Sequence, residues 1–303
     1  MNPAPPSRRG SLLPGLIAIL CWCWSGVCFR KGSDLMGSSM AYLALMTGCG
    51  SLTAVALQRL QGHSVIDMIR LPLKVVVAGF FGVALYTILL AKAFGMAAEA
   101  DIGQINLLNY LWPVWMVVLG VALLGRRPRM LPAAAGLLMG LLGVVMARGF
   151  DSFGHWPENL APHAFALTGG FLWALYVVLL RKWNIPEAQG GTALHFAVCA
   201  VLAGLLAHAG GGWRHMPPWS GDRLFWVLLG GIGPVGIAYA LYEISVKNGP
   251  VLLLASLAYF IPIGSSLLIG FFFRETLGAG LLLGAGLIAA GAWLVRHSCR
   301  EDV

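Results

Sequence analysis

The sequence contains little charge for its length. Only 11% of its 303 residues are Asp, Glu, Lys or Arg, whereas about a quarter of the residues of soluble domains are charged. Hydrophobic residues make up 58% of the chain, and its mean hydropathy is +0.80. This composition excludes most soluble enzyme classes and predicts an all-α protein embedded in a membrane.

Several motifs that carry chemistry are also missing from the sequence. It has no H-E-x-x-H, no G-x-S-x-G, no phosphate-binding loop and no C-x-x-C pair. We therefore expect no enzyme activity, no metal site and no cofactor. The Lys and Arg residues are scattered between apolar runs, which is typical of topology signals and argues against nucleic acid as a partner. The six cysteines are interpreted as small core residues.

The apolar runs are long enough to cross a bilayer ten times. A crossing takes about 20 residues in a helix, and charges, Pro and Gly divide this chain into runs of that size. The predicted spans are 12–29, 38–58, 72–94, 100–124, 131–149, 163–182, 190–210, 223–246, 250–273 and 276–297.

An even number of spans places both termini on one side of the membrane. Most of the Lys and Arg residues fall in loops on that side, including Arg8, Arg59, Arg126 and Lys182, so this side is predicted to be cytoplasmic. The expected divisions are a disordered cytoplasmic tail 1–11, a first five-helix repeat 12–149, a periplasmic linker 150–162, a second five-helix repeat 163–297 and a cytoplasmic tail 298–303.

The two halves of the chain resemble each other weakly. Tyr110 and Pro113 recur as Tyr259 and Pro262 at an offset of 149 residues, and Trp24 and Trp173 share that offset. Two copies of an odd number of helices insert in opposite orientations, so the pattern predicts inverted repeats arranged as a basket-like bundle. Inverted repeats are typical of secondary transporters, whose substrate site lies near the midplane between the halves.

Interrupted helices in the fourth and ninth spans mark the expected site. Pro113 removes the helical partner of the Asn109 carbonyl, and Pro262 does the same to Ala258. Gln104, Asn106 and Asn109 make the fourth span the most polar one, and Asn106 and Asn109 lie in one stripe with Pro113 and Gly120. In the ninth span Ser256 and Tyr259 lie at helical spacing before Pro262. The alternative is that both prolines only bend their helices for packing. Their paired placement favours a cavity lined by these groups.

Aromatic residues deep inside the spans are the expected walls of that cavity. Trp24, Tyr86, Tyr110, Trp112 and Trp173 lie too far from the span ends for an interfacial belt. Other rings are interpreted mainly as core or belt residues, namely Trp22, Tyr176, Tyr239, Tyr242 and Phe260. Aromatic walls with polar groups suit a ligand that has an apolar part and a small zwitterionic head.

Acidic residues are absent from the middle of every predicted span. Glu99 and Asp101 begin the fourth span, and Glu243 lies near the end of the eighth. Proton-driven antiporters use a buried carboxylate for which protons and substrate compete. We therefore expect facilitated diffusion, with His195 in the seventh span as a candidate proton carrier whose alternative role is structural.

With this duplicated five-helix unit, the chain resembles the EamA-type drug/metabolite transporter superfamily over essentially its whole length. The run NYLWP at 109–113, Trp24, Tyr86 and Trp173 look like the bacterial members of that superfamily that export aromatic amino acids. The resemblance implies an inner-membrane carrier that works by alternating access. It also implies that Tyr86, Tyr110, Trp112 and Trp173 line the central cavity.

The leading hypothesis is a monomeric, lipid-embedded exporter of aromatic and other neutral amino acids. A multidrug or metabolite exporter of the same superfamily is the second hypothesis, because aromatic walls also suit apolar cations. A structural or sensory scaffold has too little surface outside the membrane in this chain, and a lipid-modifying enzyme lacks a nucleophile and base.

Overall fold

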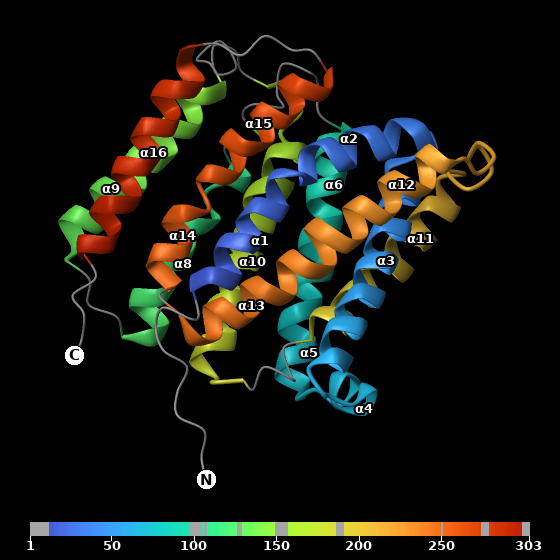
Figure 1. Ribbon diagram of the computed structural model, residues 1–303, viewed down its shortest axis with the longest axis horizontal. Coiled ribbons are helices and arrows are strands. Elements are labelled where there is room, and N and C mark those ends of the chain that lie inside the picture. The colour runs from blue at the N-terminus through green and yellow to red at the C-terminus, as the bar shows by residue number, and fades with distance from the viewer. Residues whose placement is uncertain are drawn as a thin grey trace.

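The computed structural model describes residues 12–96, 105, 108–125, 129–148, 157–185, 191–249, 251–273 and 279–298. Within these ranges every regular element is a helix, as the composition predicts, and the helices pack into one bundle (Figure 1). In chain order they are α1 (Leu12–Cys23), α2 (Ser25–Met36), α3 (Ser39–Leu60), α4 (Val65–Ile69), α5 (Leu73–Gly79), η1 (Phe80–Leu85), α6 (Tyr86–Met96), α8 (Trp112–Leu124), α9 (Met130–Arg148), α10 (Ala161–Lys182), α11 (Thr192–Ala209), α12 (Gly221–Gly230), η5 (Gly231–Ile237), α13 (Ala238–Asn248), α14 (Val251–Leu257), α15 (Phe260–Phe273) and α16 (Ala279–Ser298).

Seven helical segments of the described chain are long and apolar enough to cross a membrane. Four of them join two or three elements, because α1 continues into α2, α5 through η1 into α6, α12 through η5 into α13, and α14 into α15. The chain is therefore a multi-pass membrane protein. Trp112–Leu124, Met130–Met146 and Gly286–Val295 are shorter apolar helices, so a total of ten spans stays a prediction.

The helix breaks expected at the two prolines are present. Tyr110 and Leu111 form a turn, and α8 then begins at Trp112 with Pro113 in its first turn, where proline is tolerated. In the second half α14 ends at Leu257 and α15 begins at Phe260. The same local rule thus interrupts the corresponding helix of each half.

Two π-helical segments were not expected from the sequence. η1 lies in the third predicted span and η5 in the eighth, so each half has one in its third helix. η5 contains Pro234, which removes one backbone donor from the helix. Gly82 of η1 lies so close to Tyr176 of α10 that a side chain at this position would clash. Short π-helical segments interrupt regular helices and often occur at functional sites.

The last helices of the two halves, α9 and α16, pack tightly against each other, and they lie side by side at the left of Figure 1. A side chain at Gly136 would meet the carbonyl oxygen of Gly291, and one at Gly143 would meet that of Gly284. A shift of 148 residues turns Gly136 into Gly284 and Gly143 into Gly291, so it maps one contact onto the other. Such a self-complementary pair of contacts indicates two-fold pseudo-symmetry and supports the inverted repeat.

We expect Gly291→Ala to lower the stability of the folded protein by about 1–3 kcal/mol, because its methyl group would collide with the Gly136 carbonyl. Gly286→Ala in the same helix is the matched control, because a methyl group there meets no described atom within 4 Å. Thermal unfolding in detergent measures the stability of both variants. Equal unfolding temperatures for the two variants would contradict a tight contact between α9 and α16.

Candidate functional site

Trp173 of α10 lies at the centre of a cluster of aromatic rings. Its ring stacks on Tyr86 with the centroids 5.9 Å apart and 22° between the planes, and it meets Tyr239 edge-on at 5.0 Å. Trp173 is only 5% exposed, so protein rather than lipid surrounds it. The centroids of four further rings lie within 6.5 Å of its own: Trp22, Trp112, Tyr176 and Tyr242.

The rings of this cluster come from both halves of the chain. Trp22 belongs to α1, Tyr86 to α6 and Trp112 to α8, whereas the partners in α10 and α13 belong to the second half. Trp22 also packs on Tyr242 at 4.8 Å and on Tyr239 at 5.1 Å, so contacts cross between the halves more than once. The cluster therefore occupies the position between the repeats where the sequence places the substrate site.

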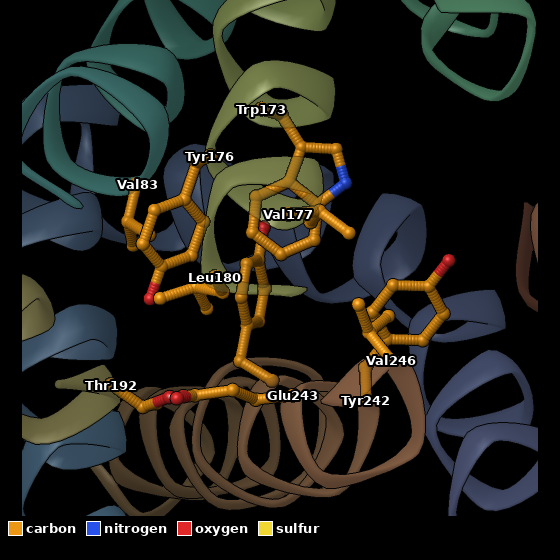
Figure 2. Close-up of a pocket in the computed structure, with 10 residues that line it drawn as sticks. Val83, Trp173, Tyr176, Val177, Leu180, Thr192, Tyr242, Glu243 and Val246 are labelled. Atoms are coloured by element: carbon orange, nitrogen blue, oxygen red, sulfur yellow. The ribbon is translucent and has the colours of Figure 1, made fainter. Parts of the chain in front are cut away.

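A small cavity adjoins the cluster on the side of α13. The rings of Trp173, Tyr176, Tyr239 and Tyr242 form much of its wall, and Glu243 and Thr192 lie at its other end (Figure 2). Its volume is about 10 Å³, roughly what one water molecule needs. An amino acid does not fit between the rings as they are packed here, so substrate entry requires the rings to separate.

Glu243, at the polar end of the cavity, belongs to a buried ion pair. The ammonium of Lys247 lies 2.8 Å from Oε1 of Glu243, and the hydroxyl of Thr192 donates to Oε2 at 2.5 Å. The two charged side chains are 5% and 10% exposed. Glu243 lies near the end of its span, as the sequence predicts, but its side chain lines the cavity, so the absence of acidic residues from the middle of the spans does not keep a carboxylate out of the cavity. Facilitated diffusion stays a prediction.

His195 lies one turn beyond Thr192 in α11 and is almost fully buried. Its ring packs edge-on against Tyr176 with the centroids 5.7 Å apart, and it fits against Gly79 and Gly191, which have no side chains. The backbone of Val75 lies within hydrogen-bonding reach of this ring. The structure thus places His195 behind the cavity wall, and a role in proton transfer stays a prediction.

The structure brings together Tyr86, Trp112 and Trp173, as the sequence predicts. Asn109 is buried beside this group, with its side chain within hydrogen-bonding reach of the Tyr86 hydroxyl. Its Oδ1 has no partner among the described residues, and its backbone carbonyl lies against Gly170 of α10. Tyr110 is buried in the turn before α8.

The polar stripe expected in the fourth span is only partly visible. Gln104 and Asn106 lie outside the described residues. Asn109 is therefore the polar residue of this stripe whose surroundings the structure describes.

Trp24 does not take part in the ring cluster. It lies between α1 and α2 and packs on Phe272 at 5.8 Å, together with Trp226, in a separate apolar cluster. Its neighbour Trp22 occupies the central position instead. Side chains two residues apart on a helix point in nearly opposite directions, so only one of these two tryptophans can face the centre of the bundle.

In the ninth span, the groups that the sequence assigns to the cavity pack against α9 or bond within the turn. The Tyr259 ring packs against Gly140 of α9, and the hydroxyls of Tyr259 and Ser256 are buried without a partner among the described residues. The carbonyl of Ala258 accepts a hydrogen bond from the amide of Ile261 at 3.0 Å. The turn itself thus satisfies the carbonyl that Pro262 releases, and contact of Ser256 or Tyr259 with substrate stays a prediction.

Comparison with protein families gives the class of the molecule. The model of the EamA-like transporter family matches residues 10–149 and again residues 161–296, which are the two halves of the chain. The chain therefore belongs to the EamA-like transporter family. Two successive matches also agree with the repeat that the glycine contacts between α9 and α16 indicate.

The chain is similar to proteins named aromatic amino acid exporter YddG. It is 32% identical to the one from Ancylobacter novellus over 94% of this chain and 96% of that protein. It is 25% identical to the one from Escherichia coli over 95% of this chain and 97% of that protein. A solved crystal structure with 28% identity covers 97% of this chain and 100% of its own, with a TM-score of 0.82.

We expect Trp173→Ala to lower the stability of the folded protein by about 3–5 kcal/mol, because the change leaves a void among the rings that surround it. Trp293→Ala is the control, since this ring on α16 is 59% exposed. Thermal unfolding in detergent compares the two variants. A loss for Trp173→Ala no larger than that for Trp293→Ala would contradict the central position of Trp173.

Proposed function

We propose that this chain exports aromatic and other neutral amino acids across the bacterial inner membrane. The observation that carries the proposal is the ring cluster around Trp173, which both halves build and which ends in the Glu243–Lys247 ion pair. Flat rings suit the side chain of an aromatic amino acid, and charged groups suit its zwitterionic head. The names of the relatives and their coverage of nearly the whole chain support the same function.

The transport cycle proposed for the chain is alternating access between its halves. In the conformation described here the rings are in contact and the cavity holds no more than about one water molecule. Movement of one half against the other separates Trp22, Tyr86 and Trp112 from the rings of the second half. Substrate then enters the space between them, and closure on the other face completes transport. Both repeats lie within one chain, so a monomer suffices for this cycle.

We place the entrance to the substrate cavity on the cytoplasmic side of the membrane. The cavity extends from Trp173 toward Leu180 and Val246, near the ends of α10 and α13, and it reaches Thr192 at the start of α11. Arg181, Lys182 and Lys247 occur at these helix ends. Loops rich in Lys and Arg are typical of the cytoplasmic side. In the same orientation both termini are cytoplasmic.

Export of apolar cations is less well supported than export of amino acids. Glu243 supplies a carboxylate that a cation would need, but Lys247 already neutralises it at 2.8 Å. A cation without a carboxylate would leave the Lys247 charge buried and uncompensated, which is costly in an apolar bundle. An amino acid is a zwitterion, so its binding leaves the net charge of the cavity and the ion pair unchanged.

We expect the reconstituted protein to exchange labelled phenylalanine and tryptophan in a counterflow assay. Proteoliposomes loaded with unlabelled amino acid should accumulate the label transiently, and liposomes without protein are the control. Tetraphenylphosphonium in excess should compete weakly. Absence of counterflow for both amino acids would contradict the proposed substrate, and strong competition by the cation would favour the multidrug alternative.

Substitution of the neighbouring tryptophans Trp22 and Trp24 should affect transport differently. Trp22→Ala removes a ring that contacts Trp173, Tyr239 and Tyr242, so we expect a loss of about tenfold or more in the initial rate of phenylalanine counterflow. Trp24→Ala is the matched control, because this ring packs in the separate cluster with Phe272. The amount of folded protein is checked by gel filtration. Equal rates for the two variants would argue against the ring cluster as the substrate site.

A further inference from the structure

We propose that the Glu243 carboxylate, held by Thr192, binds the α-ammonium group of the substrate, and that the resident Lys247 ammonium gives up this place and turns to the substrate's α-carboxylate. The inference rests on the proposed function, because it assigns the head of the amino acid to one end of the cavity. The binding site of the zwitterionic head is then formed by α13 and α11, whereas the sequence suggests the interrupted fourth helix.

Burial of the ion pair is difficult to explain by stability alone. Glu243 and Lys247 are 10% and 5% exposed, and the cavity that Glu243 lines is otherwise mostly apolar or aromatic. Removing two charges from water costs several kcal/mol per ion, and mutual attraction often recovers no more than this. Ionisable groups inside membrane segments therefore point to a function, with the partner that they contact as part of it.

The position of Glu243 connects the charge to the aromatic site. Glu243 and Tyr242 are neighbours in α13, and both line the cavity together with Trp173 of α10 (Figure 2). Tyr239 lies one helical turn earlier and meets the Trp173 ring at 5.0 Å. One face of α13 thus presents aromatic rings followed by a carboxylate, in the order in which an aromatic amino acid presents its side chain and its head.

The two oxygens of Glu243 have different partners, which makes an exchange possible. Thr192 of α11 donates to Oε2, and Lys247 contacts Oε1 from the next turn of α13. An α-ammonium group that replaces the Lys247 ammonium at Oε1 leaves the bond from Thr192 intact. The substrate's carboxylate then offers Lys247 a new anion, so each charge remains paired throughout.

A purely structural role of Glu243 and a role in binding the ammonium group predict different effects on ligand affinity. If Glu243 only ties α13 to α11 through Thr192, its loss lowers stability but affects all ligands of the ring cluster alike. If Glu243 binds the ammonium group, its neutralisation affects only ligands that carry one. Phenylalanine and 3-phenylpropionate share the ring and the carboxylate but differ in the ammonium group, so the ratio of their affinities separates the two roles.

The experiment measures competition of both compounds against labelled phenylalanine on the full-length protein in detergent. We expect the wild type to bind phenylalanine about 10- to 100-fold more tightly than 3-phenylpropionate, because a hydrogen bond to a charged group is lost with the ammonium. Glu243→Gln should bring this ratio close to one. Glu243→Asp keeps the charge and should keep a preference for phenylalanine. Glu158→Gln removes an exposed carboxylate and is the matched control.

Thr192→Val provides a second variant in case Glu243→Gln does not fold. It removes the hydroxyl that fixes Oε2 and keeps the shape of the side chain, so we expect the ratio to fall by about two- to tenfold. An unchanged ratio in the folded Glu243 or Thr192 variant would overturn the assignment of the head group and leave amino acid export intact. Failure of the wild type to bind phenylalanine at all would overturn both.

Discussion

The packing of aromatic rings against Trp173 is the interaction on which the contact between the two halves and the proposed substrate site both depend. Helices inside a bilayer gain little from the hydrophobic effect, so close packing between them must hold the two halves together. Rings from α1, α6 and α8 meet rings from α10 and α13 at this one place. In the proposed transport cycle, the same contacts that close the bundle break and form again.

Two features of the backbone make such a change easier without loss of the fold. The glycine contacts between α9 and α16 hold the last helices of the two halves at close distance. The third helix of each half contains a π-helical segment, η1 or η5, and each lies directly before a helix that carries rings of the cluster, α6 or α13. Irregular helical turns of this kind allow the flanking segments to change direction. The π-helical segments and the ring cluster are thus adjacent in the chain.

The sequence predicts the fold better than it predicts the site. Length and hydropathy locate the apolar helices, and Pro113 and Pro262 locate the two breaks, because these signals depend only on local chemistry. Tyr86, Trp112 and Trp173 are predicted correctly as neighbours. The sequence does not place Trp22, Tyr239 or Glu243 in the site. η5 changes the helical register before Tyr239 and Glu243, so counting at 3.6 residues per turn fails there. Trp22 lies only two positions before Trp24, and the sequence does not tell which of the two faces the centre. Glu243 was also judged by its depth along the span, whereas its side chain direction decides that it reaches the cavity.

A structure of the protein determined with phenylalanine bound tests the central claim most directly. We expect the phenyl ring of the ligand between Trp173 and the rings of the first half, which then lie farther from Trp173 than the 6.1 Å of Trp22 and the 5.9 Å of Tyr86 seen here. Phenylalanine bound elsewhere in the bundle, with the ring cluster unchanged, would contradict it.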